Sequence, residues 1–486
     1  MDSVHNWTVV PRVANVGEPS RYLHRVDIEA AAGFTRGHLE QVARAEGIRD
    51  IEFGLIRNGG LFAHEVIGGG LIGRQFRIAS MTKSFTAATI LALRDRGVLA
   101  LDDQVSSYLP QLRRIGLPDD APALRIRHLL TMTAGFPTDD PWGDRQEGLP
   151  VEDFDELGAG GISVCRVPGL DFEYSNLGYA LLGRVITAVT GLPYTDVVRD
   201  TILDPLELTS TTYDVATTTN RVVGWHPLAD EQVEQVEPSP GAFSPMGGLW
   251  STVPDLVQWV KFLSSAWRVA PIDGPIDPWS RREMQSPQTF ARLEAGADGC
   301  VAQSYGMGLY VAEHQGTGRF IHHSGGYPGF GSHMRWHPQS GWGIVALANR
   351  TYAPMGKACA AILADIVSET EVESTERALS ALWPETATAM SLAESLLTEW
   401  DDASLDAIAS MNLDLDQPRS ERKARWHELT ALGPFVRGSV SSTSPAHARW
   451  TMTGDRGDVR IEVLMSPESP PRLQALRIED LSSGGG

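Results

Sequence analysis

The sequence predicts an α+β fold: an antiparallel sheet flanked by helices, with a separate helical lobe and a small second α+β domain towards the C-terminus. The first observation is a hairpin signal, Asn58-Gly59-Gly60, between two apolar runs. The second is the long stretch from 80 to 205, where apolar residues recur at helical spacing. The third is the return of strand-like apolar segments between 305 and 348. This order of strands, helices and strands is typical of an α+β protein.

The first domain is expected to cover residues 31–370, after an irregular N-terminal arm over residues 1–30. Its helix from Met81 to Arg96 has apolar residues at helical intervals and stops at Gly97, a favoured C-terminal cap. A Pro/Gly/Asp-rich stretch, Phe136 to Gly169, interrupts the helices and is expected to line the mouth of a cleft. The other expected elements are a helix near Arg36–Glu46, strands at Ile51–Arg57 and Leu61–Val66, a strand end at Gln75–Ala79, a helix at Asn176–Thr190, strands at Tyr305–Val311, Phe320–His323, Ser332–Trp336 and Gly343–Ala348, and a helix to about Val367.

A second domain is expected over residues 371–486, because glutamates interrupt the apolar pattern at Ser368–Ser380. We expect a small α+β accessory domain that ends in a disordered tail, Leu481 to Gly486. Its expected role is either that of a packing partner or dimer surface, or that of a wall or lid that restricts the cleft. Its expected helices are Ala387–Trp400, Leu405–Met411 and Ser420–Leu432, and its strands are Phe435–Ser441, Ala448–Thr453, Val459–Met465 and Leu473–Ile478.

Ser80-Met81-Thr82-Lys83 places a serine one helical turn before a lysine, at the start of a predicted helix. The two side chains share one face, so the lysine amine can reach the serine hydroxyl. The positive end of the helix dipole favours an oxyanion there and disfavours a protonated lysine. The same spacing recurs at Ser420 to Lys423 in a charged helix, and an N-cap serine beside a solvated lysine is the alternative for any single match.

Tyr174-Ser175-Asn176 opens the helix that ends at Thr190. The Tyr174 phenol is placed to take or return a proton beside Ser80, and the Asn176 amide to hold Lys83 and a substrate carbonyl. An ordinary half-buried aromatic is the alternative for Tyr174.

The segment Ile321-His322-His323-Ser324-Gly325-Gly326 follows a strand and leads into a Gly-rich turn. Two glycines let a substrate lie close to an edge strand, which makes the Gly326 N–H a candidate oxyanion donor opposite the Ser80 N–H. Paired histidines also suggest a metal, but neighbours on a strand point to opposite faces, and no carboxylate or cysteine stands at ligand spacing. We therefore expect no metal and no cofactor.

In this order, the three motifs resemble those of the serine β-lactamase and penicillin-binding-protein superfamily, in the branch with class C β-lactamases, D-aminopeptidases, β-lactamase-like esterases and thioesterases. The resemblance covers roughly residues 30 to 365 and implies a β-lactamase/transpeptidase-like fold. It extends to three further phrases: Leu99-Ala100-Leu101-Asp102-Asp103, His128-Leu129-Leu130-Thr131-Met132-Thr133-Ala134-Gly135 and Gly247-Gly248-Leu249-Trp250-Ser251-Thr252.

The resemblance implies that Ser80 is the acylated nucleophile, Lys83 its base or electrostatic partner and Tyr174 a proton shuttle. Asn176, His323, Ser324 and Gly325 would bind substrate, and the backbone N–H groups of Ser80 and Gly326 would form the oxyanion hole. One position departs from the pattern: many members have lysine where His323 stands. Histidine is mostly neutral at pH 7, so the grip on a substrate carboxylate is weaker and neutral esters, amides or thioesters are favoured over penicillins.

The function expected from these motifs is a serine hydrolase or acyl-transfer enzyme that works through an acyl-enzyme on an ester or peptide-like amide. A penicillin-binding-protein-type thioesterase or peptide cyclase is one alternative, and a β-lactamase or D,D-peptidase is another. A catalytically silent binding protein of the same fold is the alternative outside the enzymes, although the complete residue set speaks against it.

The composition of the chain limits the classes of partner that it is expected to bind. The chain has 486 residues and a net charge of −20, which would repel nucleic acid and anionic lipid surfaces. Three separated cysteines suggest buried free thiols rather than disulfides, and the N-terminal residues show no signal-like apolar run. We expect a cytoplasmic protein that acts on a small-molecule or peptide-like substrate, with a homodimer as a possible assembly.

Overall fold

The computed structural model of the chain describes residues 28–114, 116, 121–214, 220–228, 231–268, 270–296, 299–315, 317–368 and 382–481. The predicted arm, the domain boundary at 370/371 and the C-terminal tail fall wholly or almost wholly outside these residues. Of the arm, the described part belongs to α1 (Ile28–Glu46), which starts eight residues earlier than the sequence predicts.

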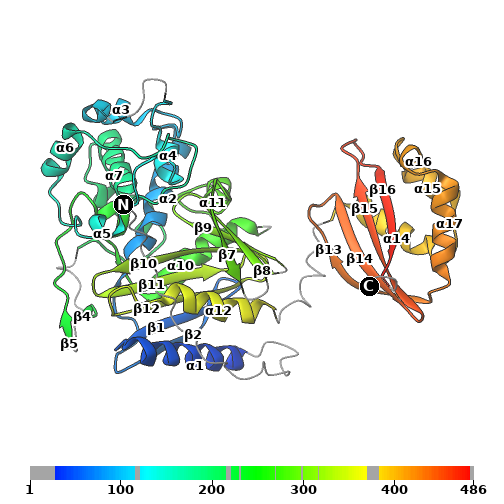
Figure 1. Ribbon diagram of the computed structural model, residues 1–486, viewed down its shortest axis with the longest axis horizontal. Helices are drawn as coiled ribbons and strands as arrows, with labels where there is room; N and C mark the ends of the chain where they lie inside the picture. The colour runs from blue at the N-terminus through cyan, green and yellow to red at the C-terminus, as the bar shows by residue number, and fades with distance from the viewer. Residues whose placement is uncertain are drawn as a thin grey trace, which may run out of the picture.

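An eight-stranded antiparallel sheet forms the centre of the first unit, in the order β2-β1-β12-β11-β10-β9-β8-β7 (Figure 1). Strand residues alternate between its two faces, and each face has its own apolar core. Helices α1 and α12 (Met355–Ser368) cover one face, and α10 (Val253–Ser264) packs on the other. The strands are β1 (Ile51–Arg57), β2 (Gly60–Ile67), β7 (Thr289–Gly296), β8 (Gly299–Tyr305), β9 (Tyr310–His314), β10 (Gly318–Tyr327), β11 (Phe330–Trp336) and β12 (Trp342–Ala348).

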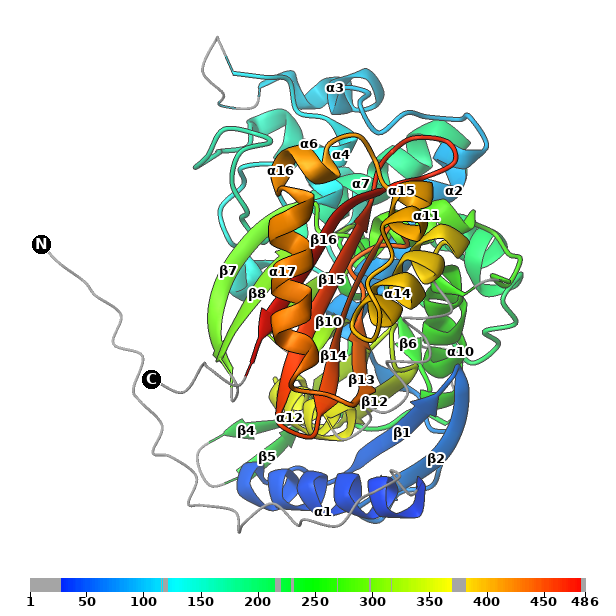
Figure 2. The ribbon, with the colours of Figure 1, turned by 90° about the vertical axis from the view of Figure 1, so that its right-hand side faces the viewer.

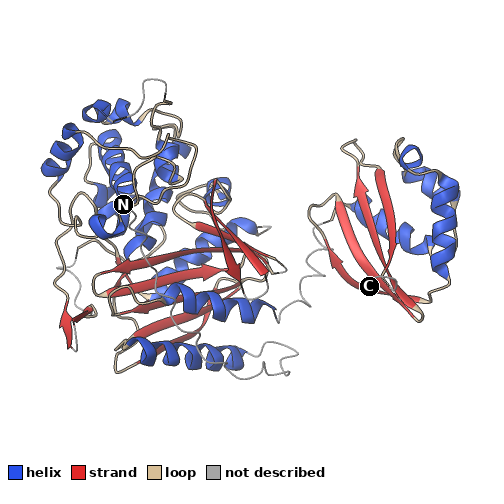
Figure 3. Ribbon diagram, viewed as in Figure 1, coloured by secondary structure: helices blue, strands red, loops and turns tan. Residues whose placement is uncertain are grey.

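A helical lobe stands at one end of this sheet, and Figure 3 shows the division between helices and strands. Helix α2 (Thr82–Asp95) carries twelve buried residues and forms the middle of the larger core. The lobe's other segments are α3 (Val105–Tyr108), η2 (Pro110–Arg114), α4 (Ile126–Leu130), α5 (Asp140–Gly143), α6 (Val151–Gly160), α7 (Asn176–Thr190), α8 (Tyr194–Val198) and η3 (Arg199–Leu203). Shorter elements near the sheet are β3 (Phe76–Arg77), η1 (Ala79–Met81), β4 (Trp225–Leu228), β5 (Glu231–Glu234), α9 (Ser244–Gly247), β6 (Trp250–Ser251), η5 (Ser265–Trp267) and α11 (Pro278–Met284).

The C-terminal unit is a four-stranded antiparallel sheet, β13-β14-β15-β16, with helices on one face and its own apolar core (Figure 2). Its elements are α14 (Pro384–Leu396), α15 (Asp402–Ile408), α16 (Leu413–Asp416), α17 (Arg419–Thr430), β13 (Phe435–Ser441), β14 (His447–Gly454), β15 (Gly457–Met465) and β16 (Leu473–Asp480). The α+β class predicted from the sequence is confirmed.

One predicted strand is wrong. Residues Tyr305–Val311 are not a single strand, because the chain turns between β8 and β9 and pairs Tyr305 with Tyr310. Gly308, at φ +73°, allows that turn. The sequence prediction also missed β7 and most of β8 and ended β10 four residues too early, at His323.

Candidate active site

Ser80 lies where β3 passes into α2, in the short 3₁₀ turn η1. The preceding residue, Ala79, has φ +49°, a conformation that a residue with a Cβ rarely adopts. Strain of this kind persists only where the surroundings enforce it, and it is common at functional sites. The sharp turn places the Ser80 side chain, 8% exposed, beside the first turn of α2.

Lys83 is fully buried and donates three hydrogen bonds. Its Nζ is 2.9 Å from Ser80 Oγ, 2.6 Å from Asn176 Oδ1 and 2.8 Å from the Met246 carbonyl oxygen. Burial lowers the pKa of Lys83 from 10.5 to about 8, against the opposing effect of nearby carboxylates. A lysine with this pKa is neutral often enough near pH 7 to accept the Ser80 proton.

Tyr174 lies two residues before the start of α7, and the centre of its ring is 5.0 Å from Lys83 Nζ and 6.5 Å from that of the stacked Tyr310 ring. Burial raises the pKa of Tyr174 well above 10, and a hydrogen bond with Ser80 partly opposes that shift. The phenol is therefore neutral at pH 7. The phenol can relay a proton, whereas Lys83, with its lowered pKa, is the better base in the enzyme without substrate.

Strand β10 runs past the nucleophile. A Cβ on Gly325 would lie 2.2 Å from the Ile78 carbonyl oxygen and 3.1 Å from Ala79 Cβ, so only glycine allows this approach. His323 faces the same side, with Nε2 3.3 Å from the Tyr305 hydroxyl and the ring 6.4 Å from that of Tyr174. Burial, reinforced by Lys83, lowers the pKa of His323 to about 3, so this residue carries no charge at neutral pH.

His322 and Ser324 alternate with His323 along β10, so their side chains point to the opposite face of the strand. The exposed Ser324 hydroxyl is bonded to His333 Nδ1 at 2.8 Å, and His322 stacks on Tyr310. Within the described part of the chain, no group of three or more His, Cys, Asp or Glu side chains is placed to hold a metal ion.

Several acidic residues around Lys83 were missed by the sequence analysis. Asp139, 9% exposed, accepts the backbone N–H groups of Asn176 and Leu177 at 2.7 and 2.8 Å, at the start of α7. Asp140 accepts a hydrogen bond from Asn176 Nδ2 at 2.8 Å. These contacts fix the Asn176 amide so that its oxygen faces Lys83. The signal available in the sequence was the pair Asp139-Asp140 within the stretch expected to line the cleft.

A buried ionic cluster lies close to these carboxylates. Arg77 contacts Glu147 and Glu237, both at 3.1 Å, and its guanidinium stacks over the Tyr327 ring. Burial raises the pKa of Glu237 to about 7. Arg77 belongs to β3, so the cluster anchors the strand that leads into the nucleophile turn.

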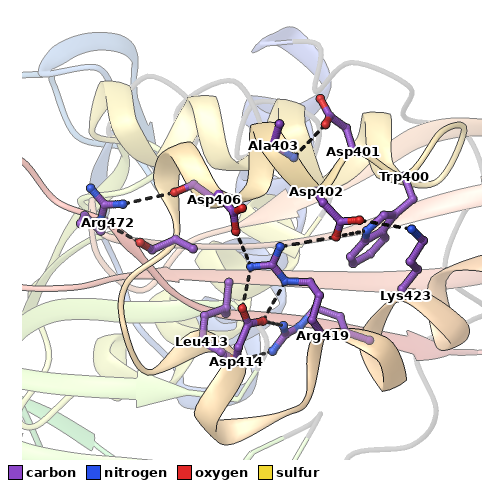
Figure 4. A network of polar contacts seen from close by, with 12 residues as sticks. Trp400, Asp401, Asp402, Ala403, Asp406, Leu413, Asp414, Arg419, Lys423 and Arg472 are labelled. Carbon is purple, nitrogen blue, oxygen red and sulfur yellow. Dashed lines mark hydrogen bonds and ion pairs between the residues drawn. The ribbon is translucent and has the colours of Figure 1, made fainter.

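The second serine-x-x-lysine segment has different surroundings. Lys423 is 42% exposed and pairs with Asp402 at 3.2 Å on the surface of the C-terminal unit (Figure 4). Asp402 also accepts the Trp400 ring N–H. Lys423 is held as part of a surface ion-pair network and not directed at a serine.

The expectation of buried thiols is wrong for two of three cysteines: Cys165 and Cys300 are exposed, and only Cys359 is buried. None of the helices in the described ranges combines the length and the apolar character that a membrane crossing needs.

An antiparallel sheet with a helical lobe, and a buried lysine bonded to a serine at their junction, defines the class of serine β-lactamase and penicillin-binding-protein-like proteins. The sequence model of the family described as Beta-lactamase matches residues 60–368, so the chain belongs to the Beta-lactamase family. The predicted resemblance is confirmed.

Curated relatives include Protein flp of Staphylococcus aureus (strain N315), 27% identical over 57% of this chain, and the D-alanyl-D-alanine-carboxypeptidase/endopeptidase AmpH of Escherichia coli (strain K12), 27% identical over 60%. The chain spans about half of Protein flp (53%) and 75% of AmpH. Among solved structures, the octameric penicillin-binding protein homologue from Pyrococcus abyssi has a TM-score of 0.61 at 20% identity, covering 90% of this chain and 91% of its own. EstCE1, a hydrolase with promiscuous acyltransferase activity, has a TM-score of 0.57 at 20% identity, covering 70% and 98%. These likenesses show a shared fold.

Proposed function

We propose that this protein is a serine hydrolase that transfers the acyl group of an ester or peptide-like amide to water through an acyl-enzyme on Ser80. The observation that carries the proposal is the 2.9 Å contact between Lys83 Nζ and Ser80 Oγ, with the lysine buried and its pKa lowered to about 8. A neutral amine at this distance can act as the base that activates a hydroxyl.

In the proposed reaction, Ser80 Oγ attacks the substrate carbonyl carbon while its proton passes to Lys83, directly or through the Tyr174 hydroxyl. The Ser80 and Gly326 backbone N–H groups donate hydrogen bonds to the carbonyl oxygen and stabilise the negative charge that develops on it. Tyr174 returns the proton to the leaving oxygen or nitrogen, and the acyl-enzyme forms. A water molecule then gives its proton to the same pair of residues and attacks the acyl carbon, which releases the acid and restores Ser80.

Neutral substrates are favoured by the environment of His323. The imidazole is 1% exposed and its pKa lies far below neutrality, so it offers no fixed positive charge to a substrate carboxylate. A side-by-side assay of p-nitrophenyl esters, D- and L-aminoacyl anilides, nitrocefin and peptidyl thioesters separates the possible reactions. We expect ester turnover to exceed nitrocefin turnover and both to vanish in Ser80→Ala.

Other outcomes of that assay support the alternatives. Efficient nitrocefin cleavage without ester cleavage would make a β-lactamase or D,D-peptidase the better assignment, and cyclisation of a peptidyl thioester would favour a peptide cyclase. The names of AmpH, a carboxypeptidase/endopeptidase, and EstCE1, an acyltransferring hydrolase, keep these alternatives open. No turnover and no covalent adduct would indicate a silent binding protein.

Three further expectations belong to the same proposal. Residues 31–370 form the catalytic domain and residues 371–486 an accessory domain, which limited proteolysis followed by mass spectrometry of the fragments tests. The protein is cytoplasmic, which cell fractionation tests. A homodimer is one assembly that the chain could form, which light scattering tests.

A further inference from the structure

Tyr352 lies in the loop between β12 and α12 and has φ +51°, in the left-handed region. A bulky aromatic residue is disfavoured there. Ala79, directly before Ser80, has the same kind of strained backbone. Contacts around Tyr352 must therefore hold it in place.

Those contacts join the sheet to the helical lobe. The Tyr352 N–H donates to the Phe330 carbonyl oxygen at 3.1 Å, and its hydroxyl donates to Asp144 Oδ2 at 2.8 Å. Asp144 follows α5 and is only 5% exposed. The neighbouring Gly143 packs so closely on Asn176 that a Cβ there would lie 2.8 Å from Asn176 Cβ. Tyr352 is thus tied to the segment that supports Asn176.

The ring of Tyr352 lies over Gly326, the candidate oxyanion donor. A Cβ on Gly326 would be 2.7 Å from Tyr352 Cδ1. Strand β9 pairs with β10 only as far as His322, so the backbone from His323 to Tyr327 has no β9 neighbour on that side. Tyr352 remains 50% exposed despite its anchors. Tyr352 therefore has exposed surface beside the part of β10 expected to hold the substrate carbonyl.

We propose that Tyr352 determines substrate size: its ring is the wall of the acyl site beside Gly326, and its hydrogen bond to Asp144 holds that wall in place. Unbranched groups pass this wall, and bulky or branched groups on the carbonyl side are rejected. The inference rests on the proposed function of Ser80. A wall that excludes one or a few carbon atoms discriminates by about 10- to 200-fold.

The test compares covalent labelling rates for two fluorophosphonates, one with a methyl and one with a cyclohexyl substituent on phosphorus. Tyr352→Gly removes the ring and suits a positive φ, so the fold should be retained. Tyr352→Asn is a second variant, because asparagine tolerates the same backbone region. Tyr352→Phe keeps the ring and loses only the bond to Asp144. Tyr108→Phe is the matched control, because Tyr108 also donates to a carboxylate, that of Asp103, elsewhere in the helical lobe.

We expect the ratio of cyclohexyl to methyl labelling to rise about tenfold or more in Tyr352→Gly and Tyr352→Asn. Tyr352→Phe should show a smaller rise, and Tyr108→Phe none. A ratio within twofold of wild type in both Tyr352→Gly and Tyr352→Asn, with Ser80 still labelled, would overturn the inference and leave the proposed function standing. An unchanged ratio in Tyr352→Phe would overturn the role of the Asp144 bond. A wild-type protein labelled by neither probe would overturn the proposed function and this inference with it.

Discussion

The ionisation of Lys83 should govern how activity depends on pH, and Asp144→Asn should move it. With a pKa of about 8, about 10% of Lys83 is neutral at pH 7, against about 0.03% at the ordinary value of 10.5. The rate constant kcat/KM should therefore rise with pH to a plateau, with a midpoint near 8. The Asp144 carboxylate favours protonated Lys83, so neutralising it should lower the lysine pKa further.

The size of that shift follows from the burial of both groups. A charge close to a buried partner changes a pKa by about one unit or more. A shift of one unit would move the midpoint from about 8 to about 7. Neutral Lys83 at pH 7 would then increase from about 10% to about 50%, a roughly fivefold gain in kcat/KM at that pH. The asparagine oxygen still accepts the Tyr352 hydroxyl, which limits structural change.

The assay is p-nitrophenyl acetate hydrolysis between pH 5.5 and 9.5, with the rate of Ser80→Ala subtracted at each pH to remove hydroxide-driven hydrolysis. Asp153→Asn is the control, because Asp153 is exposed in the first turn of α6. A profile without an ionisation between pH 7 and 9, or a midpoint in Asp144→Asn that stays or moves upwards, would refute Lys83 as the base.

Three further predictions test separate parts of the site. Tyr174→Phe and Lys83→Ala should each lower kcat strongly, and the double variant should be little worse than either, because the groups act as a unit; multiplicative losses in steady-state kinetics would contradict this. Asp139→Ala should lower the free energy of unfolding in urea by about 2 kcal/mol, because two buried N–H groups of α7 lose their acceptor, whereas Asp153→Ala should change little. His323→Lys should raise nitrocefin turnover relative to p-nitrophenyl acetate by adding a cation, at some cost in stability because position 323 is buried; an unchanged ratio would remove His323 from substrate selection.

Local signals made much of the fold predictable. The turn at Asn58-Gly59-Gly60, with φ +52° and +80° at its first two residues, fixes the β1–β2 register, and α7 has the predicted bounds because Ser175 caps it and Gly191 ends it. The turn between β8 and β9 was missed although Gly306 and Gly308 mark it. Strand β7 was missed because its apolar side chains, such as Phe290 at 59% exposure, face solvent and give no buried pattern.

In the candidate site too, the residues that local signals predict differ from those that only the tertiary fold brings together. Ser80 and Lys83 share one helical turn, so spacing alone brought them together, and the order of motifs added Tyr174 and Asn176. Asp144 and Tyr352 come from segments 208 residues apart, and only the tertiary fold brings them together. The strain at Ala79 and Tyr352 is equally invisible in the sequence, because neither residue type favours a positive φ.

Identification of the labelled residue tests the central claim most directly. Wild-type protein and the Ser80→Ala and Ser420→Ala variants are treated with a fluorophosphonate, digested and analysed by mass spectrometry. We predict one adduct, on Ser80, at equal levels in wild type and Ser420→Ala and absent from a folded Ser80→Ala. An adduct on any other residue, or labelling that survives Ser80→Ala, would contradict the assignment of Ser80 as the nucleophile.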